Sequence, residues 1–223
     1  MFNRIIGYGD TYMPLVALII FLIIKKKIRP EEKSFIYFLV TNTVLLFVIN
    51  IIPFFGYHNL FLYPFYYLFD LIFVTYYVTK HLLKLFNPLF YIITAGYFLF
   101  WLTDIFVWEG INSFISNAAA LEKIIIFFLC MYYIITLAKT DDILKFQKLP
   151  GFWIASGFLI SAAMGIFAVV AYKYYIQYNL TESGNNVWMF DSIGTVLKFT
   201  LIITGFLCYK RNPRLPYQSP TLL

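Results

Sequence analysis

The chain has 223 residues, of which 61% are hydrophobic, 22% aromatic and only 13% charged. A soluble domain carries about 25% charged residues, so this composition excludes an ordinary soluble protein. The formal net charge of +6 would favour a nucleic-acid partner in a soluble protein. Here the basic residues sit at the ends of apolar segments, where membrane topology accounts for them, and we expect no nucleic-acid partner.

Seven apolar segments follow one another along the chain, and the breaks between them leave no room for a second domain. A helix needs about 20 apolar residues to cross the hydrocarbon core of a bilayer. The predicted helices cover about 12–24, 34–54, 60–83, 89–108, 114–138, 152–172 and 187–209, and the first may begin near Ile5. We therefore expect an all-α integral membrane protein, a single domain over 1–223 built as a bundle of seven transmembrane helices.

Lysine and arginine predict how this bundle is oriented, since they favour the cytoplasmic side. Thirteen fall on one side and two on the other. The larger set is Lys25, Lys26, Lys27, Arg29, Lys33, Lys80, Lys84, Lys139, Lys145, Lys148, Lys210, Arg211 and Arg214. The sequence thus predicts an outside N-terminus and a cytoplasmic C-terminus. The high Phe, Tyr, Ile and Lys usage indicates an AT-rich bacterial genome, and with it the inner membrane.

Six polar residues inside the predicted helices are candidates for a ligand-binding site. An ionisable side chain in a membrane costs about 2.5–3.5 kcal/mol on insertion scales and suggests a site. The candidates are Asn50, Asp70, Asp104, Glu122, Asp191 and Lys198. Asp70 and Lys198 are predicted to lie deep, and the others in the outer half. We expect them to line a cavity open to the outside; the alternative is that helix ends near water are simply polar.

Lys198 is expected to be neutralised by a carboxylate. It lies seven residues after Asp191, hence on the same helix face, with Thr195 between them. Pairing with Asp70 on the third helix is equally compatible with the sequence. A buried lysine on a seventh helix also resembles the Schiff-base lysine of retinal-binding rhodopsins, which leaves a retinal-binding protein as a minor alternative.

The histidines, cysteines and small residues do not indicate a catalytic or metal-binding site. His58 and His81 lie on opposite sides, and no metal-binding or catalytic motif is found, so we expect no metal and no cofactor. Two cysteines, Cys130 and Cys208, are interpreted as small buried hydrophobic residues. The sixth helix carries a stripe of small residues, Gly157, Ser161 and Gly165. Such a stripe indicates close helix packing within the bundle or, alternatively, a homodimer interface.

The stretch 121–167 combines a helix that opens with Leu121-Glu122, a polar connection, the motif Leu149-Pro150-Gly151-Phe152-Trp153, and the step Ser156-Gly157. In these features it resembles a family of small seven-helix membrane proteins of Bacteroidetes. Genes of this family often lie beside those of sensor histidine kinases. The resemblance implies a seven-helix fold and a histidine kinase or other signalling partner.

Three functions follow as hypotheses. The first is a receptor-like or sensory module that binds a ligand from outside and signals through a partner at a basic cytoplasmic face. The second is a membrane-embedded enzyme that uses the intramembrane carboxylates as acid and base on a lipid. The third is a small transporter, which the lack of an internal repeat disfavours.

Overall fold

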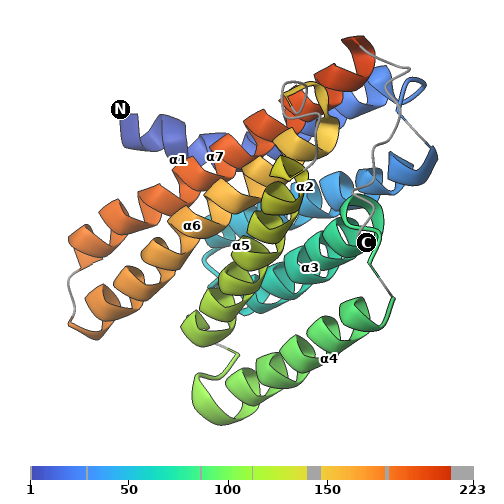
Figure 1. The fold of residues 1–223 in the computed structure, drawn as a ribbon. Helices are drawn as coiled ribbons and strands as arrows, with labels where there is room; N and C mark the ends of the chain where they lie inside the picture. The colour runs from blue at the N-terminus through green and yellow to red at the C-terminus, as the bar shows by residue number, and fades with distance from the viewer. Residues whose placement is uncertain are drawn as a thin grey trace.

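The computed structural model describes residues 2–28, 30–85, 87–111, 113–139, 147–178 and 181–211. In these residues the chain forms an all-helical bundle without a strand (Figure 1). The helices are α1 (Phe2–Ile24), α2 (Phe35–Ile51), α3 (Tyr63–Tyr76), α4 (Asn87–Thr103), α5 (Ser116–Ala138), α6 (Pro150–Gln177) and α7 (Thr181–Arg211). Short helical turns flank them: η1 (Pro30–Ser34), η2 (Ile52–Phe55), η3 (Leu60–Leu62) and the π-helical η4 (Tyr77–Leu82) and η5 (Asp104–Trp108).

Six helical segments in the described part of the chain are long and apolar enough to cross a membrane. They are Glu32–Phe55, Leu60–Leu82, Pro88–Trp108, Ser116–Ala138, Pro150–Tyr175 and Asn186–Tyr209. The apolar part of α1, Gly9–Ile24, is shorter. Large apolar side chains such as Ile23, Phe106 and Phe167 are exposed on the outer surface. Since water would disfavour so apolar an exterior, the bundle has the surface of a multi-pass membrane protein.

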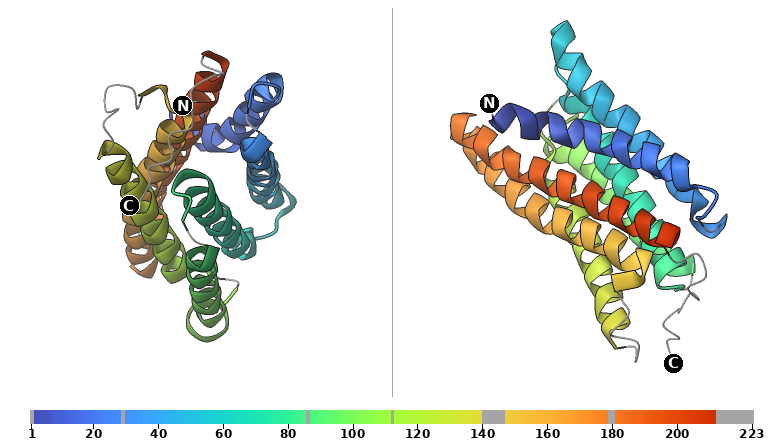
Figure 2. Two further views of the ribbon diagram at one scale, coloured as in Figure 1. Left: turned by 45° about the vertical axis from the view of Figure 1, so that its right-hand side comes forward. Right: turned by 90° about the horizontal axis from the view of Figure 1, so that it is seen from above.

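Consecutive helices alternate in direction, so the loops gather at two ends (Figures 1 and 2). Asn50, late in α2, bonds to Thr11, early in α1, and Trp101, late in α4, bonds to the carbonyl of Pro64, early in α3. One end therefore collects the described parts of the lysine-rich segments 25–33, 80–84 and 139–148 and the end of α7. We call it the basic end. Helix α4 stands at the side of the bundle, against α3 and α5.

Helices α6 and α7 form the most extensive contact in the bundle, and the predicted small-residue stripe faces it. A Cβ atom built on Gly157 would lie 2.8 Å from the carbonyl oxygen of Lys198. One built on Gly194 would lie 3.4 Å from the Cα atom of Ser161. In a bilayer, helices associate through such close van der Waals packing. The stripe is therefore used within the bundle, and α7 covers the face that the homodimer alternative required.

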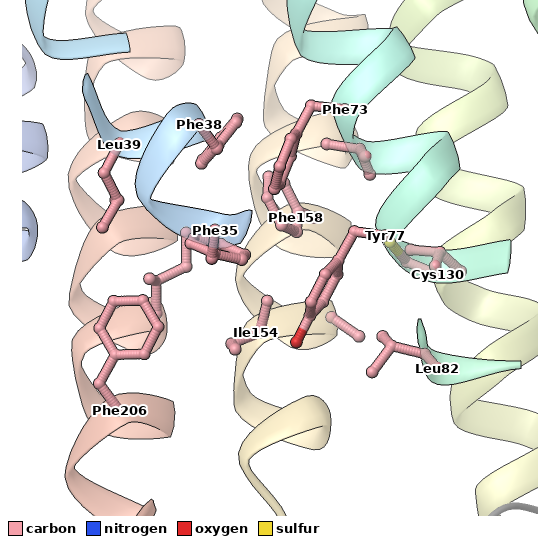
Figure 3. Packing of buried hydrophobic residues seen from close by; sticks show 14 of the residues in the cluster. Phe35, Phe38, Leu39, Phe73, Tyr77, Leu82, Cys130, Ile154, Phe158 and Phe206 are labelled. Carbon is pink, nitrogen blue, oxygen red and sulfur yellow. The ribbon is translucent and has the colours of Figure 1, made fainter. Parts of the chain in front are cut away.

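The half of the bundle nearer the basic end is filled by a packed aromatic cluster (Figure 3). Phe38 of α2 stacks on Phe73 of α3 with ring centroids 4.5 Å apart. Phe35 contacts Tyr77 and Phe206 edge to face at 5.1 and 5.4 Å. Such ring pairs add stabilisation beyond the area that they bury. This half of the protein is closed by side chains from α2, α3, α6 and α7.

The sequence placed the start of the first helix too late. The segment was predicted from about residue 12, with a possible start near Ile5, whereas α1 begins at Phe2. Gly7, Gly9 and Asp10 are poor helix formers and lower the local hydropathy, which made the start of the helix hard to place. Asp10 is in fact inside α1. The remaining helix bounds differ by a few residues, and 140–146 and 212–223 of the predicted cytoplasmic face lie outside the described residues.

Candidate functional site

A cavity of about 220 Å³ lies between α1, α2, α3 and α7 at the end of the bundle opposite the basic end. Each helix contributes side chains from its part near that end. The lining residues are Asp10, Leu46, Ile49, Asn50, Tyr63, Tyr66, Tyr67, Trp188, Asp191, Ser192 and Thr195. We call this cavity the tyrosine pocket. Polar and aromatic groups dominate its wall.

Hydrogen bonds tie three helices together around the tyrosine pocket. The Asp10 carboxylate accepts from the hydroxyls of Ser192 at 2.9 Å and Thr11 at 3.1 Å, joining α1 to α7. The amide of Asn50, which is exposed at the rim, donates to Thr11 Oγ1 at 2.9 Å and joins α2 to α1. Two of the predicted residues, Asn50 and Asp191, therefore share one cavity, as expected from their predicted depth.

Lys198 lies one layer deeper, between the tyrosine pocket and the aromatic cluster. Its ammonium is 3.7 Å from Asp70 Oδ1 and 3.4 Å from the Tyr66 hydroxyl. Lysine and aspartate are each only 1% exposed. The Lys198 nitrogen is 5.2–6.0 Å from the ring centroids of Phe38, Tyr66, Phe158 and Phe199. Of the two expected partners, Asp70 is the one that pairs with Lys198, and Tyr66 links this pair to the pocket wall.

A second buried ion pair lies on α5. Lys123 Nζ is 3.1 Å from Glu122 Oε2 and 5.6 Å from the centre of the Tyr67 ring, and both charged side chains are buried. A Cβ atom on Gly165 would lie 3.0 Å from both Asp191 Oδ1 and Lys123 Cε. The missing side chain of Gly165 thus gives these two groups room to approach each other behind the tyrosine pocket.

The structure does not bring Asp104 to this site. Its carboxylate accepts from the backbone N–H of Ala118 and the side-chain amide of Asn117, both at 3.0 Å. Both residues belong to the first turn of α5, where unpaired N–H groups and the helix dipole favour a carboxylate. Asp104 is therefore an N-terminal cap of α5, and its burial follows from that structural contact.

Glu109 also caps the N-terminus of α5. Its contacts predict how the stability of the fold changes in acid. It accepts from the Ser116 hydroxyl at 2.6 Å and from Lys173 Nζ at 2.7 Å. Burial acts to raise the pKa of Glu109, but the bonds from Lys173, Ser116 and Asn117 outweigh it and hold the pKa below its ordinary value of 4.5. A carboxylate with a lowered folded-state pKa stabilises the fold above its unfolded pKa and loses that contribution as the pH falls.

We therefore expect the melting temperature to fall as the pH drops below about 4.5, and the Glu109→Gln variant to show a smaller fall. At neutral pH the variant should have a free energy of unfolding about 1 kcal/mol lower than the native protein. The loss is small because Lys173 is half exposed and water screens its charge. Thermal unfolding of both proteins in detergent between neutral and acid pH measures the difference. Parallel pH curves for the two proteins would contradict the assignment.

Sequence reasoning missed Asp10 and the tyrosines. Asp10 lies before residue 12, the main predicted start of the first helix, and was not among the candidate residues. Tyr63, Tyr66 and Tyr67 were not among the candidate residues, although Tyr66 and Tyr67 are buried in the bundle. The signal available was the spacing of Tyr63, Tyr66, Tyr67 and Asp70, since residues three and four apart share one helix face.

The helices and the tyrosine pocket together define a multi-pass helical membrane protein with a polar site in one half of its bundle. No group of three or more His, Cys, Asp and Glu side chains that could hold a metal ion occurs among the described residues. Comparison with protein-family models, curated proteins and solved structures found no match for this chain.

Proposed function

We propose that this protein is a receptor-like or sensory module of seven transmembrane helices in a bacterial inner membrane. In this proposal α1 completes the set of spans, the N-terminus is outside and the C-terminus is cytoplasmic. The asymmetric distribution of Lys and Arg supports this orientation, because the basic end then faces the cytoplasm. The tyrosine pocket then opens to the outside.

The observation that carries the proposal is the depth at which the path of polar groups from the pocket ends. From the tyrosine pocket, polar groups continue through Tyr66 to the Lys198–Asp70 pair. Beyond this pair the packed rings of Phe35, Phe38 and Phe73 fill the bundle. A pocket that ends on a packed core is suited to binding a ligand, and it supports a sensor over a transporter, which needs a path across.

Helix α7 offers a physical route from pocket to cytoplasm. It contributes Asp191 to the pocket, Lys198 to the buried ion pair and Phe206 to the aromatic cluster before it reaches the basic end at Arg211. A ligand that binds one position of α7 better than another shifts the population between them. The signal would then reach a partner bound at the basic end.

The lipid-enzyme alternative receives less support from the grooves that face the lipid. One groove of about 660 Å³ lies between α4 and α5, and another of about 780 Å³ follows α6. None of the carboxylates lines either groove. The retinal alternative is weakened because Lys198 does not line the tyrosine pocket, from which Tyr66 separates it.

Site-specific photocrosslinking tests the proposal. A photoreactive residue at Lys26 or Lys139, both exposed at the basic end, should capture a protein partner such as a histidine kinase in native membranes. The matched control carries the same group at Asn186, exposed at the other end. The yield at Lys26 and Lys139 should change when Asp191→Asn is introduced. Lipid adducts alone, or a yield that is indifferent to the pocket substitution, would contradict a signalling role.

A further inference from the structure

We infer that the tyrosine pocket binds a small organic cation, an amine or quaternary ammonium compound. This inference rests on the proposed function in one respect, namely that the pocket is the ligand site. It adds the chemical class of the ligand, which follows from the charge, the ring faces and the unpaired hydroxyl groups of the pocket.

The charges around the pocket do not balance. The site brings together four carboxylates, Asp10, Asp70, Glu122 and Asp191, and two lysines. Lys198 pairs with Asp70, and Lys123 pairs with its neighbour Glu122. Among the side chains that the structure describes, from Gly9 onward in α1, no Lys or Arg lies within ion-pair distance of Asp10 or Asp191. The two carboxylates left without a paired cation are the two that line the pocket, and a positive ligand would neutralise them.

Aromatic rings suited to a cation line the same pocket. Tyr63, Tyr66, Tyr67 and Trp188 contribute to its wall. Trp188 lies edge to face on Tyr63 with ring centroids 5.9 Å apart. The faces of Trp and Tyr attract ammonium groups, and cages of such rings recognise quaternary ammonium ligands. An inorganic cation would gain little from these rings, so they favour an organic one.

Two largely buried side chains of the wall also carry hydroxyl groups without partners. Tyr67 is 3% and Thr195 7% exposed, and both line the pocket. Neither hydroxyl has a hydrogen-bond partner in the described part of the chain, nor does the Asp191 carboxylate. Their oxygen atoms are not among the fully buried ones, so they remain accessible from the pocket and free to bond to polar groups of a ligand or to water.

The volume limits the size of the ligand. A protein cavity of about 150 Å³ accommodates benzene. The tyrosine pocket, at about 220 Å³, has room for a ring with a short aminoalkyl chain or for a compact quaternary ammonium compound. Choline and phenethylamine are probes of this size. Their uncharged counterparts have nearly the same shapes: 3,3-dimethylbutan-1-ol matches choline, and 2-phenylethanol matches phenethylamine.

The test measures binding of these four compounds to the full-length protein in lipid nanodiscs, at constant ionic strength, by calorimetry and thermal shift. We expect at least one of the two amines to bind and each neutral counterpart to bind about tenfold more weakly or not at all. Asp191→Asn should weaken amine binding about tenfold, because a hydrogen-bonded charge is lost. Thr200→Val, an exposed change on the same helix, should leave it unchanged.

Equal binding of amines and neutral counterparts, full competition by sodium ions, or no binding of either amine would overturn the inference. Its failure is distinguishable from failure of the proposed function. Amine binding without any change in crosslinking at Lys26 and Lys139 would uphold the cation pocket and contradict signalling. Crosslinking that depends on Asp191, without amine binding, would uphold signalling and contradict the cation pocket.

Discussion

Replacing Lys198 by methionine is expected to lower the free energy of unfolding by about 3–5 kcal/mol, the cost of breaking a buried ion pair from one side. Methionine has a similar volume, so the loss comes from the charge and not from a cavity. Asp70 is left as an uncompensated buried carboxylate among aromatic rings. Lys198→Met should therefore be among the most destabilising single substitutions in the bundle.

The ion pair between Lys198 and Asp70 leads to a second expectation. Removing both charges in the double variant Lys198→Met/Asp70→Asn should restore most of the stability, because replacing a whole buried pair is often nearly neutral. Thr200→Val is the control on the same helix, since its exposed hydroxyl bonds only to its own Val196 carbonyl. Equilibrium unfolding in mixed micelles gives the four free energies. A double variant no more stable than Lys198→Met would show that the two charges are not coupled.

Replacing Gly157 by alanine is expected to destabilise the bundle by about 1–3 kcal/mol, the usual cost of overpacking. The added Cβ atom would lie 2.8 Å from the backbone oxygen of Lys198 and 3.2 Å from Leu201 Cβ. Backbone cannot swing aside as a flexible side chain can, so α6 and α7 must separate. This separation would also displace Lys198 from Asp70.

Gly96 is the matched control, because a Cβ atom there meets nothing within 4 Å. Gly96→Ala should be neutral or stabilising by up to about 1 kcal/mol, since alanine is the better helix former. Melting temperatures of the two variants in the same detergent provide the comparison. Equal effects of the two substitutions would mean that helix propensity, and not the α6–α7 contact, controls stability.

The helices were predictable because a membrane imposes a strong pattern on sequence. A long apolar run with basic flanks has few structural interpretations, and six of the predicted segments form long apolar helices in the structure. The first segment was harder to delimit, since Gly7, Gly9 and Asp10 interrupt its hydropathy. Orientation and the count of spans stay predictions that rest on charge and length.

The site was predictable only in part, because depth along a helix does not say which way a side chain faces. Depth put Asp70 near Lys198 and placed Asn50 and Asp191 at the same level, and the structure brings each pair together. Depth also grouped Asp104 with them, although it caps α5. To distinguish a pocket residue from a helix cap, one must know which helix lies next to the side chain, and a single sequence does not give this.

The most direct test of the central claim is whether the tyrosine pocket opens to the outside. Thr195→Cys places a thiol in the pocket, and Thr200→Cys places one on the exposed face of the same helix; both need a background with Cys130 and Cys208 replaced. Thiols react as thiolates, which form in water and not in lipid. A membrane-impermeant trimethylammonium methanethiosulfonate reagent added to intact cells should modify Thr195→Cys much faster than Thr200→Cys. Modification of Thr195→Cys only from the cytoplasmic side, or no faster than the control, would contradict an outward-facing pocket.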